Sequence, residues 1–301
     1  MPRRSRSKVP RYRSTEGPRR LAGARLGAAG LALALAGCAS VADSDRAWIE
    51  NAGAVVAVQL GCPPETATPA GAGSLAGREL SMISWNIHRN GDPGWEHDLA
   101  RFAAASDLVL LQEATLTAAL RAVLGGAERP WTHADAWMFD GINNGVLTAA
   151  TTLPAAACVQ RASEPLLGLP KSALVAWYRL EGRSERLAVA NVHSINFTLD
   201  LTGYQKQLDA VVDVLAAHRG PVILAGDFNT WSPVREQALA AATARIGLVE
   251  ARPQRGERSR FLGMQADYVF VRGLDVDDVW VETVESSDHA PIRARLRLPP
   301  S

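Results

Sequence analysis

The sequence predicts a mixed α/β sandwich and not a doubly wound parallel sheet. Strand-like apolar segments alternate only loosely with amphipathic helical segments, and hairpins are interspersed among them. The sequence shows no internal repeat at a period of about 20–50 residues. The chain has 301 residues, of which 47% are hydrophobic and 21% charged. It is therefore long and apolar enough for one large α/β domain or two small ones.

The clearest strand of this sandwich covers residues 221–225, which are apolar and partly β-branched and are followed by Gly226. Asp227 and Asn229 come directly afterwards, two residues apart, so their side chains are expected on the same side of the strand end. Ligands of α/β sheets lie just beyond such strand ends. The segment indicates a polar site, although an Asx turn before the next helix would give the same pattern.

The other elements follow from hydrophobic periodicity and from turn and capping residues. We expect further strands over residues 80–85, 107–113, 131–139, 145–150, 155–159, 171–180, 186–191, 266–271 and 292–298. Helices are expected over residues 95–105, 115–124, 201–218 and 234–244. Thr115 is the expected cap of the second helix, and the strands 171–180 and 186–191 should form a hairpin.

Residues 1–37 have the composition of an export signal. They hold nine Lys or Arg and one acid, and an apolar run over residues 21–35 leads into Leu35-Ala36-Gly37-Cys38. This ending resembles the lipobox of bacterial lipoproteins, in which the chain is cleaved before the cysteine and the cysteine is lipidated. The apolar run is shorter than the roughly 20 residues of a spanning helix. We expect a signal peptide over residues 1–37, lipidation at Cys38, and a membrane-anchored lipoprotein on the periplasmic or cell-surface side; an uncleaved anchor helix is the alternative.

Residues 38–78 are rich in Ala, Gly and Pro and are expected to serve as a tether. This segment contains Cys62, and Cys158 is the only other cysteine beyond Cys38. The two could pair in an oxidising compartment, but the sequence does not decide this. Neither has the spacing of a metal-binding cysteine.

The net charge of +1 conceals an asymmetry between the leader and the rest of the chain. Outside residues 1–37 the chain has 23 basic and 30 acidic residues, a net charge of −7. A body this acidic is not a general polyanion-binding surface. Any phosphate would have to be held locally, and a metal ion is the natural means.

Polar residues suited to metal or phosphate chemistry lie at the ends of several expected strands. They are Asn86, Glu113, His193, Asp227, Asn229, Asp288 and His289, with Asp267 at the start of its strand. Scaffolds build active sites by bringing such strand ends together. Because the ligands would be hard oxygens and no cysteine takes part, the implied ion is Mg²⁺ or Mn²⁺ and not zinc.

These residues lie in six short motifs: Trp85-Asn86, Leu111-Gln112-Glu113, Asn191-Val192-His193, Gly226-Asp227-Phe228-Asn229, Asp267-Tyr268 and Ser287-Asp288-His289. Each motif alone is weak, but all six in this order are specific. Over residues 79–299 the set resembles the endonuclease/exonuclease/phosphatase superfamily. The resemblance implies the DNase I-like four-layer sandwich, in which two mixed β-sheets pack face to face with helices outside.

The resemblance also implies which residues bind the metal and the phosphate. Glu113 would be the principal metal ligand, assisted by Asn86 and Asp288. Asp227 and Asn229 would hold and orient the phosphate and the attacking water. The metal would neutralise charge developing on the phosphoryl oxygens.

Two histidines would complete the site. His289, oriented by Asp267, would act as general base or stabilise the phosphate, because a carboxylate behind an imidazole fixes its tautomer. His193 would protonate the leaving oxygen or bind phosphate; which histidine is acid and which is base stays open. Related enzymes orient the histidine at the position of His193 with a further acid that has no clear counterpart here. Asn191 and Asn196 are the candidate substitutes.

Other polar residues are interpreted more simply. Four histidines are assigned to the surface or to loops: His88, His97, His133 and His218. Arg89 and Lys171 are candidates to contact a phosphate.

The implied activity is metal-dependent hydrolysis of a phosphodiester by an activated water, with a nuclease-like substrate as the first hypothesis. The first alternative is a phospholipid or sphingomyelin phosphodiesterase, or a phosphomonoesterase, and both the membrane anchor and the acidic body favour a lipid substrate. The second alternative is a non-catalytic surface binding module. The expected partners are a phosphoester substrate (nucleic acid or phospholipid head group) and a membrane reached through the lipid anchor, and we expect a monomer.

Overall fold

The computed structural model describes residues 39–40, 46–51, 54–59, 62, 72–164, 168–196, 198, 200–261 and 263–300. The chain divides into two units, Met1–Cys38 and Ala39–Ser301. The expected signal peptide and the lipidation site at Cys38 lie outside the described residues. Within the described part of the chain, no helix combines the length and the apolar character needed to cross a bilayer.

Two seven-stranded β-sheets form the centre of the second unit. The first has the order β1 (Ala39–Ser40), β7 (Trp131–Phe139), β8 (Ile142–Ala150), β6 (Leu108–Thr115), β5 (Glu79–Asn86), β18 (Ile292–Arg297) and β17 (Asp275–Val281). The second has the order β13 (Val249–Glu250), β16 (Asp267–Arg272), β12 (Val222–Asp227), β11 (Arg186–His193), β10 (Pro170–Leu180) and β4 (Ser74–Leu75), with β9 (Ala156–Ser163) also paired to β10. Both sheets mix parallel and antiparallel pairs.

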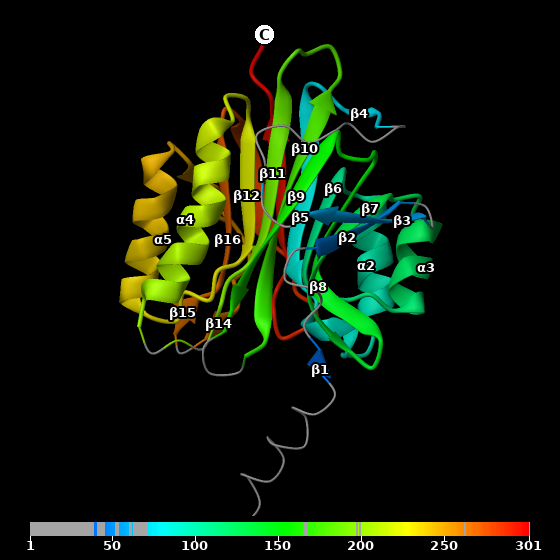
Figure 1. Cartoon of the computed structure of the whole chain (residues 1–301). Coiled ribbons are helices and arrows are strands. Elements are labelled where there is room, and N and C mark those ends of the chain that lie inside the picture. Colours follow the sequence, from blue (N-terminus) through cyan, green and yellow to red (C-terminus); the bar gives the residue numbers. More distant parts are fainter. Residues whose placement is uncertain are drawn as a thin grey trace, which may run out of the picture. The chain divides into compact units, whose positions relative to one another are not determined.

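Helices cover the outer face of each sheet, which gives four layers (Figure 1). The helices α2 (Trp95–Ala104) and α3 (Ala118–Gly126) pack on the first sheet, and α4 (Thr202–Ala217) and α5 (Pro233–Arg245) pack on the second. A third apolar cluster, which includes Leu110 and Leu174, fills the space between the sheets. The described strands and helices therefore confirm the predicted four-layer sandwich.

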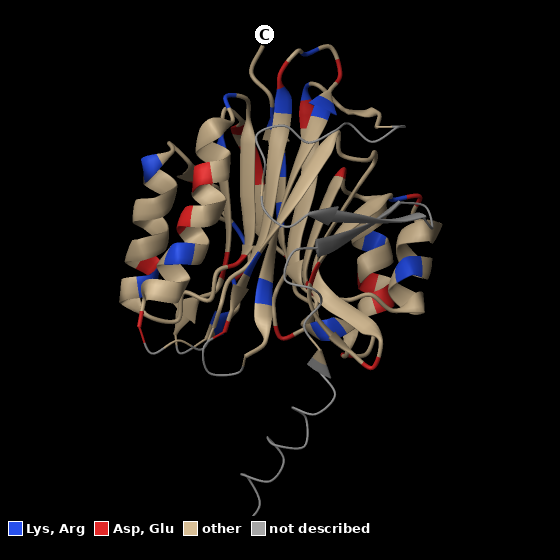
Figure 2. Cartoon of the chain, in the orientation of Figure 1, with Lys and Arg blue, Asp and Glu red and all other residues tan. Residues whose placement is uncertain are grey.

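Alternation along the strands explains how one sheet contributes to two apolar layers. On β6, Leu108 and Leu110 enter the cluster between the sheets, whereas Val109 and Leu111 pack against α2 and α3. Charged residues lie mostly on the helices and at strand ends, and the central stretches of the strands carry few (Figure 2). A strand buried on both faces reads as a continuous apolar run, which is why these strands were recognisable in the sequence.

The polar strand ends meet at one edge. In the parallel pair β11–β12, His193 is opposite Asp227, and in the antiparallel pair β12–β16, Asp227 is opposite Asp267. In the parallel pair of the first sheet, Asn86 at the end of β5 is opposite Gln112 of β6. We call the edge formed by Asn86, Glu113, His193, Asp227 and Asp267 the site edge.

Some element boundaries differ from the predictions. The second helix begins at Ala118 and is capped by Thr117, whose hydroxyl accepts a hydrogen bond from the Leu120 N–H at 3.1 Å. Thr115 is not the cap because it still belongs to β6. The strand β17 was not predicted, because the acids in its sequence Asp275–Val281 interrupt the alternation. They pair with arginines of β18, as Asp278 does with Arg295 at 3.0 Å.

Four short strands lie within residues 38–78, where the sequence suggested a tether. The strand β1 joins the first sheet beside β7, and β4 joins the second sheet beside β10. The strands β2 (Arg46–Asn51) and β3 (Ala54–Gln59) pair with each other, as do β14 (Arg260–Phe261) and β15 (Met264–Gln265) later in the chain. The segment therefore contributes strands to the sandwich, and its service as a tether stays a prediction.

A disulfide joins Cys62 to Cys158, the pairing that the sequence left open. Cys158 lies on β9 and is buried under the helices of the second sheet. The bond closes a loop of 96 residues, so it fastens the segment before β4 to the sandwich.

Candidate active site

A β-bulge places Glu113 at the site edge. The register between β6 and β8 shifts between Leu111 and Ala114, and Glu113 has a φ of 51°. Leu111 and Ala114 both pack toward α2 and α3, so the bulge takes Glu113 out of the strand alternation. A non-glycine residue in this conformation costs on the order of 1–3 kcal/mol, and such strain clusters at functional sites.

The Glu113 carboxylate is surrounded by nitrogen groups. It lies 3.7 Å from His193 Nε2, 3.6 Å from Lys171 Nζ and 3.4 Å from Arg89 Nε. His193 belongs to the opposite sheet, so Glu113 reaches across the sandwich. Arg89 and Lys171 were candidates for phosphate contact, and the structure places both on the same carboxylate.

Asp227 and Asn229 form a tight local unit at the end of β12. Asp227 Oδ1 accepts a hydrogen bond from the backbone N–H of Asn229 at 2.9 Å, and its Oδ2 accepts one from Asn86 Nδ2 at 3.0 Å. Asn229 has a φ of 48°, and its amide donates to the Ser194 carbonyl at 2.9 Å. The Asx turn and the polar site were alternatives in the sequence, and both are present.

Gly226 is required at the end of the strand because β11 approaches closely there. Its φ is 144°, and a Cβ at this position would lie 2.0 Å from the Val192 carbonyl oxygen. The absence of a side chain lets the two parallel strands bring His193 and Asp227 side by side.

Burial alters the acidity of Asp227. Removal from solvent raises the pKa of its carboxyl to about 6; the His289 charge opposes this shift and the Asp267 charge adds to it. The carboxylates of Asp227 and Asp267 are buried and repel each other, so a cation bound between them would stabilise both.

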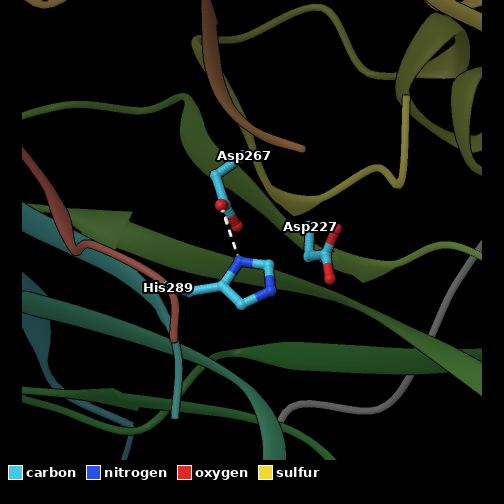
Figure 3. A group of neighbouring side chains, drawn as sticks. All are labelled: Asp227, Asp267 and His289. Atoms are coloured by element: carbon cyan, nitrogen blue, oxygen red, sulfur yellow. Dashed lines mark hydrogen bonds and ion pairs between the residues drawn. The ribbon is translucent and has the colours of Figure 1, made fainter. Parts of the chain in front are cut away.

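His289 and Asp267 form the pair that the sequence predicted. His289 Nδ1 lies 2.7 Å from Asp267 Oδ2, and the second ring nitrogen is turned toward Asp227 (Figure 3). Burial lowers the pKa of His289, but the charge and hydrogen bond of Asp267, with smaller contributions from Asp227 and Asp288, outweigh it and raise the pKa to about 10. The loop that carries His289 is fastened to β5, because Ser287 Oγ donates to the Asn86 carbonyl at 2.6 Å.

His193 lies between the acids of the two sheets. Its Nε2 is 3.5 Å from Asp227 Oδ2 and 3.7 Å from Glu113 Oε1. Burial, and then the positive charges of Lys171, His289 and Arg89, lower the pKa of His193 well below its ordinary value. The imidazole is therefore neutral near pH 7, so that one ring nitrogen can accept a proton.

The two proposed substitutes for an acid behind His193 are differently placed. Asn191 is engaged in the core, where its Oδ1 accepts from Gln112 at 2.7 Å and its Nδ2 donates to the Leu111 and Leu147 carbonyls. The suggestion that Asn191 orients His193 is therefore wrong, because its amide is used to join the two sheets. The backbone N–H of Asn196 donates to the Glu164 carboxylate at 2.5 Å.

Asp288 lies at the rim. Its side chain is 62% exposed, and its described ion pair is with His88, at 3.9 Å between Oδ1 and Nδ1. His88 in turn is held by Asp92 at 2.6 Å. The side chain of Asp288 therefore contacts a surface histidine, although it was predicted to assist Glu113 as a metal ligand.

The residues present fit a hard divalent cation. Among the described residues, ligand atoms of Asp227, Asp267 and His289 all lie within 4.8 Å of one another. The metal ligands predicted from the sequence were a different set: Asn86, Glu113 and Asp288. Asn86 is nevertheless linked to this group, because its amide donates a hydrogen bond to Asp227. Carboxylate and amide oxygens dominate both sets, which suits Mg²⁺ or Mn²⁺.

Sequence reasoning missed Arg235, whose guanidinium is buried near the start of α5. It donates to the carbonyls of Asn229 and Ile195 at 3.0 and 2.9 Å and stacks on the Trp231 ring at 4.5 Å. It therefore joins the loop after β11 to the loop after β12. The available signal was an arginine in the first helical turn, where acids are normally favoured.

His133 was assigned to the surface, and this assignment is wrong. It is fully buried on β7, with Nδ1 2.7 Å from Asp135 Oδ1 and Nε2 3.2 Å from the Ala114 carbonyl oxygen. A histidine and an aspartate two apart on a strand face the same side, which was the available signal. Because Ala114 follows Glu113, His133 braces the bulge from behind.

A sandwich with acids, amides and imidazoles gathered at one edge defines a phosphoesterase or nuclease-like protein of the DNase I-like class. The chain belongs to the Endonuclease/Exonuclease/phosphatase family, which it matches over residues 83–289. Members of this family are typically hydrolases that act on phosphoester bonds and commonly use divalent metals.

Bacterial proteins described as UPF0294 proteins are close relatives. One from Vibrio cholerae serotype O1 is 39% identical over 221 residues, which cover 73% of this chain and 78% of the relative. Another from Yersinia pestis is 40% identical over 214 residues, which cover 71% and 82%. These descriptions name no substrate.

Solved structures share the fold at low sequence identity. An endonuclease/exonuclease/phosphatase from Bacteroides vulgatus aligns with a TM-score of 0.58 at 16% identity, over 73% of this chain and 99% of that one. The TDP2 structure from C. elegans aligns with a TM-score of 0.54 at 16% identity, over 74% and 76%. At this identity the comparison shows the fold alone.

Proposed function

We propose that the protein is a divalent-metal-dependent hydrolase that cleaves phosphodiester bonds with an activated water. The observation that carries this proposal is the meeting of Glu113, His193, Asp227 and the His289–Asp267 pair at the site edge. These residues come from both sheets and span most of the chain, so their convergence is a property of the fold. Buried carboxylates whose charges repel are stabilised by a cation or by a proton.

Each residue can be given a task in the reaction. A bound Mg²⁺ or Mn²⁺ supplies neutralisation of the charge that develops on the phosphoryl oxygens. Glu113 and Asn86 are proposed to hold this ion in place of the Asp227, Asp267 and His289 group, because His289 Nδ1 is already engaged by Asp267. Asp227 and Asn229 are proposed to orient the phosphate and the water. Asn229 is held for this task by its bond to the Ser194 carbonyl.

The two histidines would handle the protons. His289 keeps a proton on the nitrogen bonded to Asp267, and its pKa of about 10 leaves the second nitrogen protonated near pH 7, facing Asp227. His193, with its low pKa, is a proton acceptor at the same pH. The directions of these two pKa shifts support different roles for the two histidines. His289 would donate a proton to an anionic oxygen or stabilise it, and His193 would receive a proton.

Two classes of phosphodiester substrate suit this site. A nucleic-acid phosphodiester is the first candidate, and a phospholipid head group is the second. A non-catalytic binding module is the third, but Glu113, Asp227, Asp267 and His289 form a complete reactive set, which argues against it. We further propose an exported lipoprotein anchored at Cys38. The Cys62–Cys158 disulfide supports an oxidising compartment.

The test uses the purified full-length protein with Mg²⁺, with Mn²⁺ or with a chelator. Soluble bis(p-nitrophenyl) phosphate, plasmid DNA, RNA, phospholipid vesicles and p-nitrophenyl phosphate serve as substrates. We expect hydrolysis of a diester that requires metal and is lost in Glu113→Gln. Hydrolysis that persists in the chelator or in Glu113→Gln contradicts the proposal, and inactivity on every substrate favours the binding module.

A further inference from the structure

Large apolar side chains that remain exposed are concentrated at the site edge. Among the described residues they are Phe139, Ile142, Val234, Val249, Phe261 and Val276. Scattered exposed apolar residues are ordinary on soluble proteins. The positions of these residues in the fold, and not their number, indicate whether they form a binding surface.

The tip of the β7–β8 hairpin projects at the site edge. Thr115, at the end of β6, pairs with Asn144 of β8, so the residues that precede Asn144 extend beyond the end of β6. Phe139 and Ile142 flank the turn and are 42% and 40% exposed. This tip therefore carries two large apolar side chains beside the bulge that holds Glu113.

A second apolar tip lies on the other side of the site. The small β14–β15 hairpin leads into β16, whose first residue is Asp267, and its Phe261 is 55% exposed. Val234, in the first turn of α5, follows the Asp227–Asn229 turn on the same edge. Two hairpin tips and a helix start thus present apolar side chains around one polar site.

The two remaining exposed residues lie at the opposite ends of strands. Val249 pairs with Val271, which is opposite Ile223 near the start of β12. Val276 pairs with Leu296, which is opposite Leu80 near the start of β5. They are single side chains far from the site edge and provide matched controls.

The chain enters the sandwich at the first of these tips. Ala39 pairs with Phe139 and Ser40 pairs with Met138, antiparallel, so β1 begins opposite Phe139 at the hairpin tip. Figure 1 shows β1, β14 and β15 at the same end of the sheets. In the sequence, Ala39 directly follows the proposed lipidation site, Cys38.

We propose that the site edge docks on a lipid bilayer, with the hairpin tips at Phe139, Ile142 and Phe261 inserted among the head groups. Stable anchoring by acyl chains generally takes a second membrane contact, and aromatic side chains favour the membrane interface. The polar site between the tips then faces the membrane surface. This inference rests on the proposed lipidation and deepens the proposed function, because a site that faces the bilayer favours the second substrate candidate, a phospholipid head group, over a nucleic acid.

The experiment measures which edge of the reconstituted protein lies in the bilayer. In the acylated protein, which would begin at Cys38, this cysteine is modified and Cys62 is paired with Cys158, so an introduced cysteine is the reactive thiol. Ile142→Cys, Phe261→Cys, Val249→Cys and Val276→Cys are each labelled with nitrobenzoxadiazole. They are then placed in vesicles of phosphatidylethanolamine and phosphatidylglycerol that contain nitroxide-labelled lipid.

We expect strong quenching of the label at positions 142 and 261 and weak quenching at 249 and 276. A combined Phe139→Ser and Phe261→Ser substitution should reduce the quenching at position 142 to the level at position 276. A Val249→Ser substitution, as the matched control, should leave it unchanged. Equal quenching at all four positions, stronger quenching at 249 and 276, or no effect of the serine substitutions at the tips overturns the proposal.

A parallel assay separates this inference from the proposed function. Every variant is assayed on soluble bis(p-nitrophenyl) phosphate, which needs no bilayer, and each should keep the wild-type rate. Inactivity of the wild-type protein on every diester would contradict the proposed hydrolase but leave the quenching pattern to decide the docking. Conversely, an active enzyme with uniform quenching would contradict the docking alone.

Discussion

Two histidine–aspartate pairs in this molecule have the same hydrogen-bond length and opposite surroundings. His289 Nδ1 lies 2.7 Å from Asp267, and His133 Nδ1 lies 2.7 Å from Asp135. The second nitrogen of His133 is bonded to the Ala114 carbonyl, and the pair is fully buried. The second nitrogen of His289 faces Asp227, and its side chain keeps 18% exposure (Figure 3).

The difference shows that a carboxylate behind an imidazole does not by itself make a reactive histidine. The carboxylate fixes the ring and its tautomer in both pairs. Reactivity depends on whether the other nitrogen is free to reach a substrate, and in His133 it is used to hold the backbone. The same chemical pair therefore leaves one ring nitrogen facing the site edge at His289, where we propose that it reacts, and supports the Glu113 bulge at His133.

The largest expected effect comes from His289→Ala. It should lower kcat by about 10²- to 10⁴-fold, because a positioned proton-transfer group contributes this much. The free energy of unfolding should also fall, but by less than in His133→Ala, because the His289 side chain is 18% exposed and that of His133 is 1% exposed. Steady-state kinetics on a soluble diester and urea unfolding measure the two quantities. Wild-type activity in this variant would exclude a role for His289.

His133→Ala should act mainly on stability. Loss of the imidazole leaves the buried Asp135 carboxylate without this partner, and breaking a buried pair costs about 3–5 kcal/mol. The measurement is urea unfolding, with exposed His97→Ala as the control expected within about 0.5 kcal/mol of wild type. If His133→Ala leaves stability unchanged but abolishes activity, the contrast between the two pairs is wrong.

Mg²⁺ should stabilise the protein through the site edge. A ligand that binds only the folded state at about 100 times its dissociation constant adds about 2.7 kcal/mol. The rise in Tm on adding Mg²⁺ should be lost in Glu113→Gln and kept in His97→Ala. An equal rise in Glu113→Gln would place the cation elsewhere.

The smallest expected effect is a pH-dependent gain in stability from Asp227→Asn in the metal-free protein. The pKa of Asp227 is raised from 3.8 to about 6, chiefly by burial, so its contribution to stability is present below pH 3.8 and is lost as the pH rises through 6. Removing the ionised carboxylate should relieve about 3 kcal/mol near pH 7.5. The amide has one acceptor oxygen in place of two and loses one of the two hydrogen bonds, at a cost of about 1 kcal/mol, so the net gain should be about 2 kcal/mol. The gain should vanish near pH 4, as thermal unfolding at the two pH values would show.

Asp135→Asn is the matched carboxylate in the other pair. It should destabilise the protein at pH 7.5, because it weakens the bond to His133. If Asp135→Asn and Asp227→Asn change the free energy of unfolding at pH 7.5 in the same direction, then the surroundings of the two aspartates do not have opposite effects on stability.

Local patterns in the sequence predicted much of the site. Asp227 and Asn229 were predicted because their spacing alone places them on one side of a strand end, and Gly226 marked the end of that strand. The His289–Asp267 pair was implied by the family motifs and confirmed by a hydrogen bond. The contacts of Arg235 and the packing of His133 were missed, because their partners are not defined by any local period.

The sequence by itself determined the class of fold and the strand ends at which polar residues gather, because burial and periodicity are written into short segments. The tertiary structure decided which of those residues touch. The bulge that turns Glu113 toward His193 needs β8 beside β6, and the entry of Ala39 beside Phe139 needs the completed sheet. Such placements depend on neighbours about 30 to 100 residues away along the chain, and no local preference specifies them.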